Sequence, residues 1–268
     1  MTDKEGAKKV EGSNAYCFSI QPFWDVSQVQ QPVRDESIAV SEFIWSRHTE
    51  VMSCVPGNGQ IAIMITPPDA FSGTCYGVAD CRRDIPLYGM KDVFFARFSP
   101  GTFSAICGIP ATEIPAEGAD ISLLFSGGQL ERLREAAADQ HPTGALLRLF
   151  EKWQEASRAG SDRSLAEQAV QLIRRSGGAM RMRQLEQETL YSARRLQDVV
   201  TRQVGISPKQ LCRQTRFQNA LKLLRKDGSN DLNCAQAAQQ LGYSDQAHFN
   251  REFKAFCGMC PSKFLNRI

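Results

Sequence analysis

Four polar side chains near the C-terminus recur at the spacing of one helix face. They are Gln246, Asn250, Arg251 and Lys254. In the major groove of DNA, a side-chain amide can form two hydrogen bonds with adenine, and a guanidinium can do the same with guanine. This set therefore predicts a helix that reads the edges of base pairs.

The residues around this face predict a helix-turn-helix unit. Ala237 and Ala238 are small enough to let a first helix approach a second one closely, and Gly242 can take the positive φ of a tight turn. Ser244 is expected to cap the second helix. The buried contacts of that helix are predicted to come from Ala247, Phe249 and Phe253.

Residues 182–204 repeat this layout. Leu185 is expected on a first helix, and Ser192 is expected to cap a second one. The apolar side of the second helix carries Leu196, Val199, Val200 and Val204, and its exposed side carries Arg194, Arg195, Gln197, Asp198 and Arg202. Between the two units, Ser207 and Pro208 predict the start of a helix that continues through Leu211, Phe217, Leu221 and Leu224. This helix would hold the units at a fixed separation.

Two such units joined by a helix resemble the DNA-binding domain of the AraC/XylS family of transcription regulators. The resemblance lies in SPKQLCRQTRFQNALKLL and GYSDQAHFNREFKAFCGMCPSKF, and it extends from about residue 165 to residue 268. It implies that one set of residues faces bases in successive major grooves: Arg194, Gln197, Asp198, Gln246, Ala247, Asn250 and Arg251.

The first unit departs from the family pattern at three positions. Glu186 stands where a small alanine usually packs, Leu190 where a glycine usually turns, and Asp198 where a basic or polar residue usually meets DNA. A carboxylate is repelled by phosphates unless it accepts a hydrogen bond from cytosine N4. We therefore expect the second unit to carry most of the base specificity. The first unit would act mainly as a positioning contact, through Arg194, Arg195 and Arg202.

The charge of the chain is divided unevenly along its length. The 268 residues contain 32 Lys+Arg and 29 Asp+Glu, of which residues 161–268 hold 18 and 9, leaving 14 and 20 for residues 1–160. The C-terminal part is therefore basic and the N-terminal part acidic. This asymmetry favours a polyanion as the partner of the C-terminal part.

The N-terminal part predicts a different architecture. Short β-branched and aromatic runs, such as residues 60–66 and 93–98, alternate with Pro/Gly turns, which is typical of a small antiparallel β domain. Between Gln129 and Ser157 the period becomes helical and predicts a helical hairpin. Residues 55–57 and 97–101 resemble the cupin-like β domain that precedes the DNA-binding module in some family members. The resemblance implies a sensory or regulatory role.

The predicted fold class is a multidomain α+β chain. A small antiparallel β barrel or sandwich with a helical hairpin is expected over residues 14–157, and an all-α domain with two helix-turn-helix units over residues 164–268. Residues 158–163 read as a linker, because they are small and polar.

Other sites could suggest a different class of protein. Cys257 and Cys260 have the spacing of a redox or zinc pair, but Cys260 directly precedes Pro261, where a helix start is expected. His48 is the one histidine in the β region, too few for a metal site of cupin type. We expect no cofactor, no metal, no disulfides and no enzymatic activity. The alternative is a thiol- or metal-dependent enzyme or repair protein that uses the module only to dock on DNA.

The predicted function is sequence-specific transcription regulation, with double-stranded DNA as the main partner. RNA polymerase and a small-molecule effector at the N-terminal domain are further candidate partners. We expect a homodimer paired through the helices between Gln129 and Ser157, whose apolar stripe exceeds what a small β domain must cover. The sequence has no membrane span and no signal peptide, which predicts a cytoplasmic location.

Overall fold

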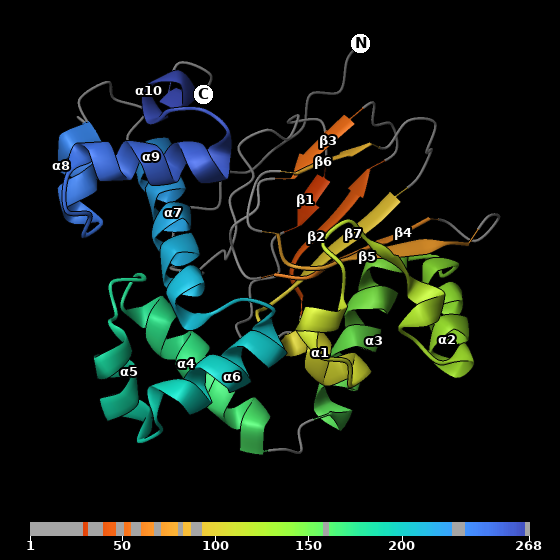
Figure 1. The fold of residues 1–268 in the computed structure, drawn as a ribbon. Coiled ribbons are helices and arrows are strands. Elements are labelled where there is room, and N and C mark those ends of the chain that lie inside the picture. Colours follow the sequence, from red (N-terminus) through yellow and green to blue (C-terminus); the bar gives the residue numbers. More distant parts are fainter. Residues whose placement is uncertain are drawn as a thin grey trace, which may run out of the picture.

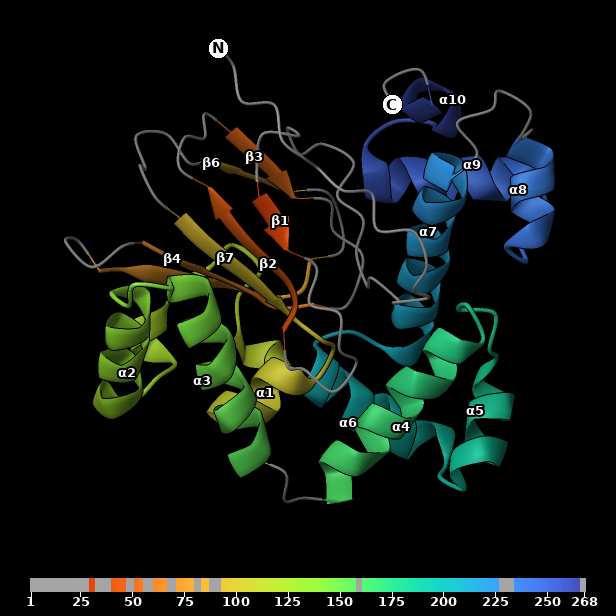
Figure 2. The same cartoon turned by 180° about the vertical axis from the view of Figure 1, so that it is seen from behind.

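A β-rich N-terminal half lies beside an all-helical C-terminal half (Figures 1 and 2). This arrangement is seen in a computed structural model that describes residues 29–31, 40–46, 51–54, 60–66, 71–79, 83–86, 93–157, 161–226 and 234–265. His48 and residues 55–57 lie outside the described residues. None of the described helices is both long and apolar enough to cross a membrane.

The N-terminal half is built on two sheets in which every described pairing is antiparallel. The larger sheet has the strand order β1-β2-β7-β4-β5-β8, and β3 pairs with β6 in the smaller one. The strands are β1 (Val29–Gln31), β2 (Val40–Ser46), β3 (Val51–Cys54), β4 (Ala62–Ile65), β5 (Gly73–Tyr76), β6 (Arg83–Pro86), β7 (Val93–Phe98) and β8 (Ala119–Asp120). This confirms the predicted small antiparallel β domain.

Three helices pack on this β domain: α1 (Thr102–Cys107), α2 (Gly127–Ala137) and α3 (Pro142–Ala156). The 3-10 turns η2 (Ala111–Glu113) and η3 (Ile121–Leu123) lie between α1 and α2. Phe98 of β7 stacks edge-on against Phe103 of α1 and Phe150 of α3, with ring centroids 4.9 Å apart in both pairs. Helices α2 and α3 pack against each other, which confirms the predicted helical hairpin.

The apolar stripe of the hairpin is used within its own domain. Leu133, Leu146, Phe150 and Trp153 are all buried in the core that includes the strands β4 and β7. The expectation that this stripe exceeds what the β domain covers is therefore wrong, because the sheet, α1 and Phe125 bury it.

The C-terminal half contains seven described helices in two groups. The helices are α4 (Ser161–Arg175), α5 (Met182–Thr189), α6 (Ala193–Val204), α7 (Pro208–Lys226), α8 (Cys234–Gln240), α9 (Gln246–Cys257) and α10 (Pro261–Leu265). The first group, α4 to α6, lies at one end of the long helix α7, and α8 to α10 lie at the other end (Figure 1). Residues 161–163 are part of α4, so this helix begins inside the predicted linker.

Helix α7 contributes to the cores of both groups, as its predicted role as a connector requires. Leu211 packs with Leu196 and Val200 of α6, whereas Phe217 packs with Phe253 of α9. Its first turn is fixed by a reciprocal cap: the backbone N–H of Gln210 donates to the Ser207 hydroxyl at 3.2 Å, and the Gln210 side chain accepts from the Ser207 N–H at 3.1 Å. The predicted helix start at Ser207 and Pro208 is confirmed.

Candidate nucleic-acid interface

The first helix-turn-helix unit consists of α5 and α6. The hydroxyl of Ser192 accepts a hydrogen bond from the backbone N–H of Arg195 and caps α6, as predicted. The apolar side of α6 is buried as expected, through Leu196, Val199, Val200 and Val204. The five predicted DNA-facing residues are exposed: Arg194, Arg195, Gln197, Asp198 and Arg202.

Two departures from the family pattern are accommodated in this unit. The Glu186 carboxylate accepts a hydrogen bond from the backbone N–H of Ala193 at 2.6 Å, so it satisfies a free donor at the start of α6 rather than adding bulk to the packing. Leu190 ends α5 in the left-handed region, with φ 61°, and its side chain is 89% exposed. The turn therefore forms without a glycine, at the cost of backbone strain.

The second unit consists of α8 and α9. Ala237 and Ala238 are buried, and Gly242 has φ 72°, so the predicted close approach and tight turn are confirmed. Asp245, rather than the predicted Ser244, caps α9: its carboxylate accepts from the backbone N–H of His248 at 2.6 Å. Ser244 supports the cap by donating to Asp245 at 3.0 Å. These hydrogen bonds, that of His248 foremost, lower the pKa of Asp245.

The face of α9 that is predicted to contact DNA is accessible to solvent for most of its residues. Gln246, Arg251 and Lys254 are exposed, and Asn250 is half-buried with its amide oxygen buried. Ala247 is exposed, so the prediction that it supplies a buried contact is wrong. Its exposure fits the DNA-facing position that the resemblance implies for it. Phe249 and Phe253 are buried, as predicted.

Positions on α6 and α9 are equivalent when they lie the same number of residues after the cap of their helix. Asp198 and Arg251 both lie six residues after the cap of their helix, Ser192 and Asp245. The same position thus carries a carboxylate in the first unit and a guanidinium in the second. Because the phosphates of DNA favour cations, the two faces are not electrostatically equivalent.

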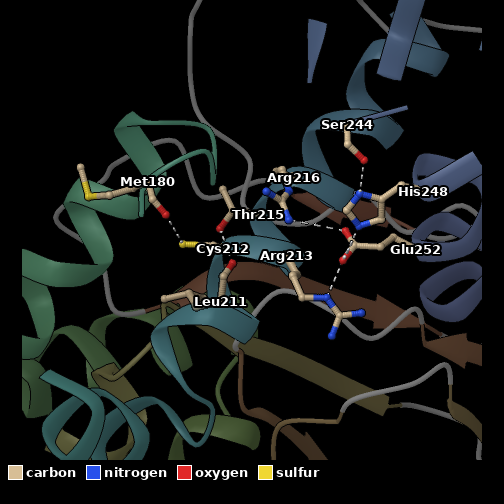
Figure 3. A network of polar contacts seen from close by, with 9 residues as sticks. All are labelled: Met180, Leu211, Cys212, Arg213, Thr215, Arg216, Ser244, His248 and Glu252. Atoms are coloured by element: carbon tan, nitrogen blue, oxygen red, sulfur yellow. Dashed lines mark hydrogen bonds and ion pairs between the residues drawn. The ribbon is translucent and has the colours of Figure 1, made fainter. Parts of the chain in front are cut away.

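Figure 3 shows a polar network that the sequence analysis missed. Glu252 of α9 has a side chain that is only 7% exposed, and its carboxylate accepts from Arg213 Nε of α7 at 2.5 Å. Arg216 of α7 approaches the other carboxylate oxygen at 3.7 Å, and His248 lies 3.7 Å from the first oxygen. The position equivalent to Glu252 in α6 is Val199, which is apolar. Glu252 is 36 residues from Arg216 and 39 from Arg213 in the sequence, so no periodic signal joins these residues.

The network fixes the second reading helix on α7. A buried carboxylate needs charged or hydrogen-bonding partners, so α9 can take only positions that keep Glu252 within reach of the two arginines. Arg216 also stacks over the ring of Tyr243 at 5.2 Å, and Arg213 over that of Phe256 at 5.5 Å. Burial and the nearby Glu252 carboxylate raise the pKa of Tyr243, so this phenol stays neutral at physiological pH.

Burial makes the thiols of Cys75, Cys107, Cys212 and Cys234 poor nucleophiles, because it raises the pKa of each. Burial raises the pKa of Cys107 to about 12 and that of Cys212 to about 11. Cys257 is buried, whereas the pKa of Cys260 is lowered by a hydrogen bond with Ser262. The part of the chain that the structure describes contains no cluster of three or more His, Cys, Asp or Glu residues able to hold a metal ion.

Comparisons with known proteins follow this division of the chain. Residues 185–267 match the family model for a helix-turn-helix domain, which spans both units. No curated protein sequence matches the chain significantly.

Solved structures resemble the chain over two different extents. A probable AraC family transcriptional regulator from Rhodopseudomonas palustris CGA009 is 28% identical over 39% of this chain and 96% of its own, with a TM-score of 0.36. The C-terminal domain of AraT, a response regulator from Geobacillus stearothermophilus, is 23% identical over 41% of this chain and 88% of its own, with a TM-score of 0.36. ToxT from Vibrio cholerae is 12% identical over 86% of this chain and 99% of its own, with a TM-score of 0.43.

Proposed function

We propose that this chain is a DNA-binding transcription regulator of the AraC/XylS type, and that its second helix-turn-helix unit carries most of the base recognition. The match of residues 185–267 to the family model for a helix-turn-helix domain supports this function. The observation that carries the proposal is the opposite charge of Asp198 and Arg251 at equivalent positions of α6 and α9. Arg251 suits a guanine edge, whereas Asp198 suits only a cytosine and is otherwise repelled by phosphates.

The surroundings of the two reading helices support the same division. Helix α9 is held on α7 by the buried carboxylate of Glu252, and a rigidly placed helix makes better base contacts than a mobile one. On α6, Asp198 is accompanied by the exposed cations Arg194, Arg195 and Arg202. These three side chains suit phosphate contacts that position the protein without reading sequence.

A scan of base substitutions tests the proposal. A duplex selected by the full-length protein from a random-sequence library would be mutated one base pair at a time, and the Kd would be measured at constant salt. We expect costly positions to gather under the second unit, and Asp198→Asn to leave affinity unchanged or to raise it. If Asp198→Asn loses affinity only for duplexes with one particular cytosine, Asp198 reads that base and the proposed inequality is wrong.

The N-terminal domain is proposed to regulate this DNA binding, with residues 14–157 as the regulatory domain and 164–268 as the DNA-binding domain. Its two antiparallel sheets suit the barrel or sandwich of a cupin-like domain. Its contacts support a regulatory role, because η2 and α1 pack against α6. The side-chain amide of Gln214 on α7 also donates to the backbone oxygen of Ala79 at 3.5 Å. An occupant of the N-terminal domain would thus act on the first unit directly.

Homodimer formation belongs to the same proposal, although the hairpin stripe is not available for it. Light scattering at micromolar concentration, with and without DNA, would test dimer formation. A monomer under both conditions would contradict the proposed homodimer. A regulator must share a compartment with the DNA it binds, which supports the expected cytoplasmic location.

A further inference from the structure

A cleft of about 710 Å³ lies between the two helix-turn-helix units and along α7. Its apolar part is lined by residues of the first unit and α4, including Ile173, Met182 and Leu185. Its polar part is lined by Arg181, Lys209, Arg213 and Arg216, and Glu252 is the only carboxylate among the described lining residues. We refer to this space as the inter-unit cleft.

The cleft opens between the two reading faces. Gln197 from the exposed face of α6 and His248 from the first turn of α9 both line it. When two recognition helices occupy successive major grooves on one side of a duplex, the minor groove between these grooves faces the protein. The phosphates that border this minor groove would then lie opposite α7, at the inter-unit cleft.

The charges in the cleft suit those phosphates. Arg181 and Lys209 are exposed and form no ion pair with any residue in the described part of the chain. Arg213 binds Glu252 through Nε alone, and its two terminal nitrogens point away from that carboxylate (Figure 3). Glu252 therefore orients Arg213 and leaves part of its guanidinium available.

We propose that the inter-unit cleft binds the DNA backbone between the two half-sites, with Arg181, Lys209 and Arg213 as phosphate contacts. This inference rests on the proposed function, because it requires both units to sit on one duplex. The cleft would set the spacing and bend of the DNA between the half-sites, while the bases themselves are read by α6 and α9.

The test uses the full-length protein and the selected duplex, with Kd measured between 50 and 200 mM salt. Lys209→Ala is the cleft variant, because its exposed side chain can be removed without disturbing the Glu252 network. Lys263→Ala is the matched control, an exposed lysine of α10 outside the cleft. Each lost phosphate contact lowers the salt slope by about 1, so over this range the affinity of wild type should fall roughly three-fold more than that of Lys209→Ala.

A second arm locates the contact. Uncharged methylphosphonate linkages would replace the phosphates between the half-sites. This should weaken wild type and Lys263→Ala to the same extent and Lys209→Ala less, because Lys209→Ala has already lost one of the three proposed contacts. If Lys209→Ala responds to this replacement as wild type does, the cleft does not hold these phosphates and the inference is overturned. Failure of the proposed function is separate, since it would appear as unchanged base preference in Arg251→Ala whatever the result for Lys209.

Discussion

At the scale of the residue, Arg251 is the side chain best placed to read a base. It is exposed on α9, six residues after the cap, on the helix that Glu252 holds against α7. Loss of a bidentate hydrogen bond to guanine should cost roughly 1 to 3 kcal/mol of the free energy of specific binding. We therefore expect Arg251→Ala to weaken binding to the selected duplex by this amount and to spare binding to random DNA, as measured by anisotropy titrations on both. An equal loss on both duplexes would make Arg251 a phosphate contact.

At the scale of the element, the two reading helices are capped by different chemistry. Asp245 caps α9 as a carboxylate whose pKa is lowered below its ordinary value of 3.8, whereas Ser192 caps α6 with a hydroxyl that does not titrate. Because folding lowers the Asp245 pKa, its contribution to stability is present above pH 3.8 and is lost as pH falls through the lower folded-state value.

This difference predicts how cap removal depends on pH. Asp245→Ala should lower the free energy of unfolding at neutral pH, and the difference from wild type should shrink as pH falls below 3.8. Ser192→Ala should cost about 1 kcal/mol at every pH, because only a hydroxyl acceptor is lost. Denaturant unfolding between pH 7 and pH 3 would check both variants. A loss in Asp245→Ala that does not change with pH would show that the carboxylate charge plays no part in the cap.

The turn between α5 and α6 stores strain that a single substitution can release. Leu190 has φ 61°, the only positive φ among the described residues other than glycine, and its side chain is 89% exposed. A left-handed conformation costs an ordinary residue about 1 to 2 kcal/mol, and little packing is lost when this side chain is removed. We expect Leu190→Gly to raise the free energy of unfolding by about 1 kcal/mol, after the entropy of glycine is counted.

Leu190→Ala is the matched control for this turn. It removes the same exposed side chain but keeps a Cβ, so it should leave most of the strain in place. Thermal and denaturant unfolding of both variants would separate the two effects. Equal stabilisation by glycine and alanine would show that exposure of the leucine, not its backbone conformation, is the cost.

At the scale of the whole molecule, the DNA-binding domain is nearly self-sufficient. Its two hydrophobic cores consist of residues from α4 to α10, and Val78 is the one described residue of the N-terminal half in these clusters, although η2 and α1 also contact α6. We expect residues 161–268 alone to fold and to bind the selected duplex, because both reading faces and the basic excess lie there. Circular dichroism and anisotropy titrations would check this, with Arg251→Ala in the same fragment as the control. A folded fragment that does not bind DNA would contradict it.

The periodic and local features of this protein could be predicted from its sequence alone. Apolar residues at helical spacing determine α6, α7 and α9, and small residues with Gly242 determine the second unit, because such patterns act between near neighbours in the chain. The cap of α9 is Asp245, one residue after the predicted Ser244, since both residue types are good caps and packing decides between them.

Only the tertiary structure decided what lies between distant segments. The burial of the hairpin stripe depends on how much apolar surface the sheet and α1 present to it, and no local pattern measures that area. The Glu252 network and the inter-unit cleft likewise join α7 to α9 across a long separation in sequence. A charged residue looks the same in a sequence whether water or a buried partner satisfies it, because only the fold sets its solvation and the distance to its partner.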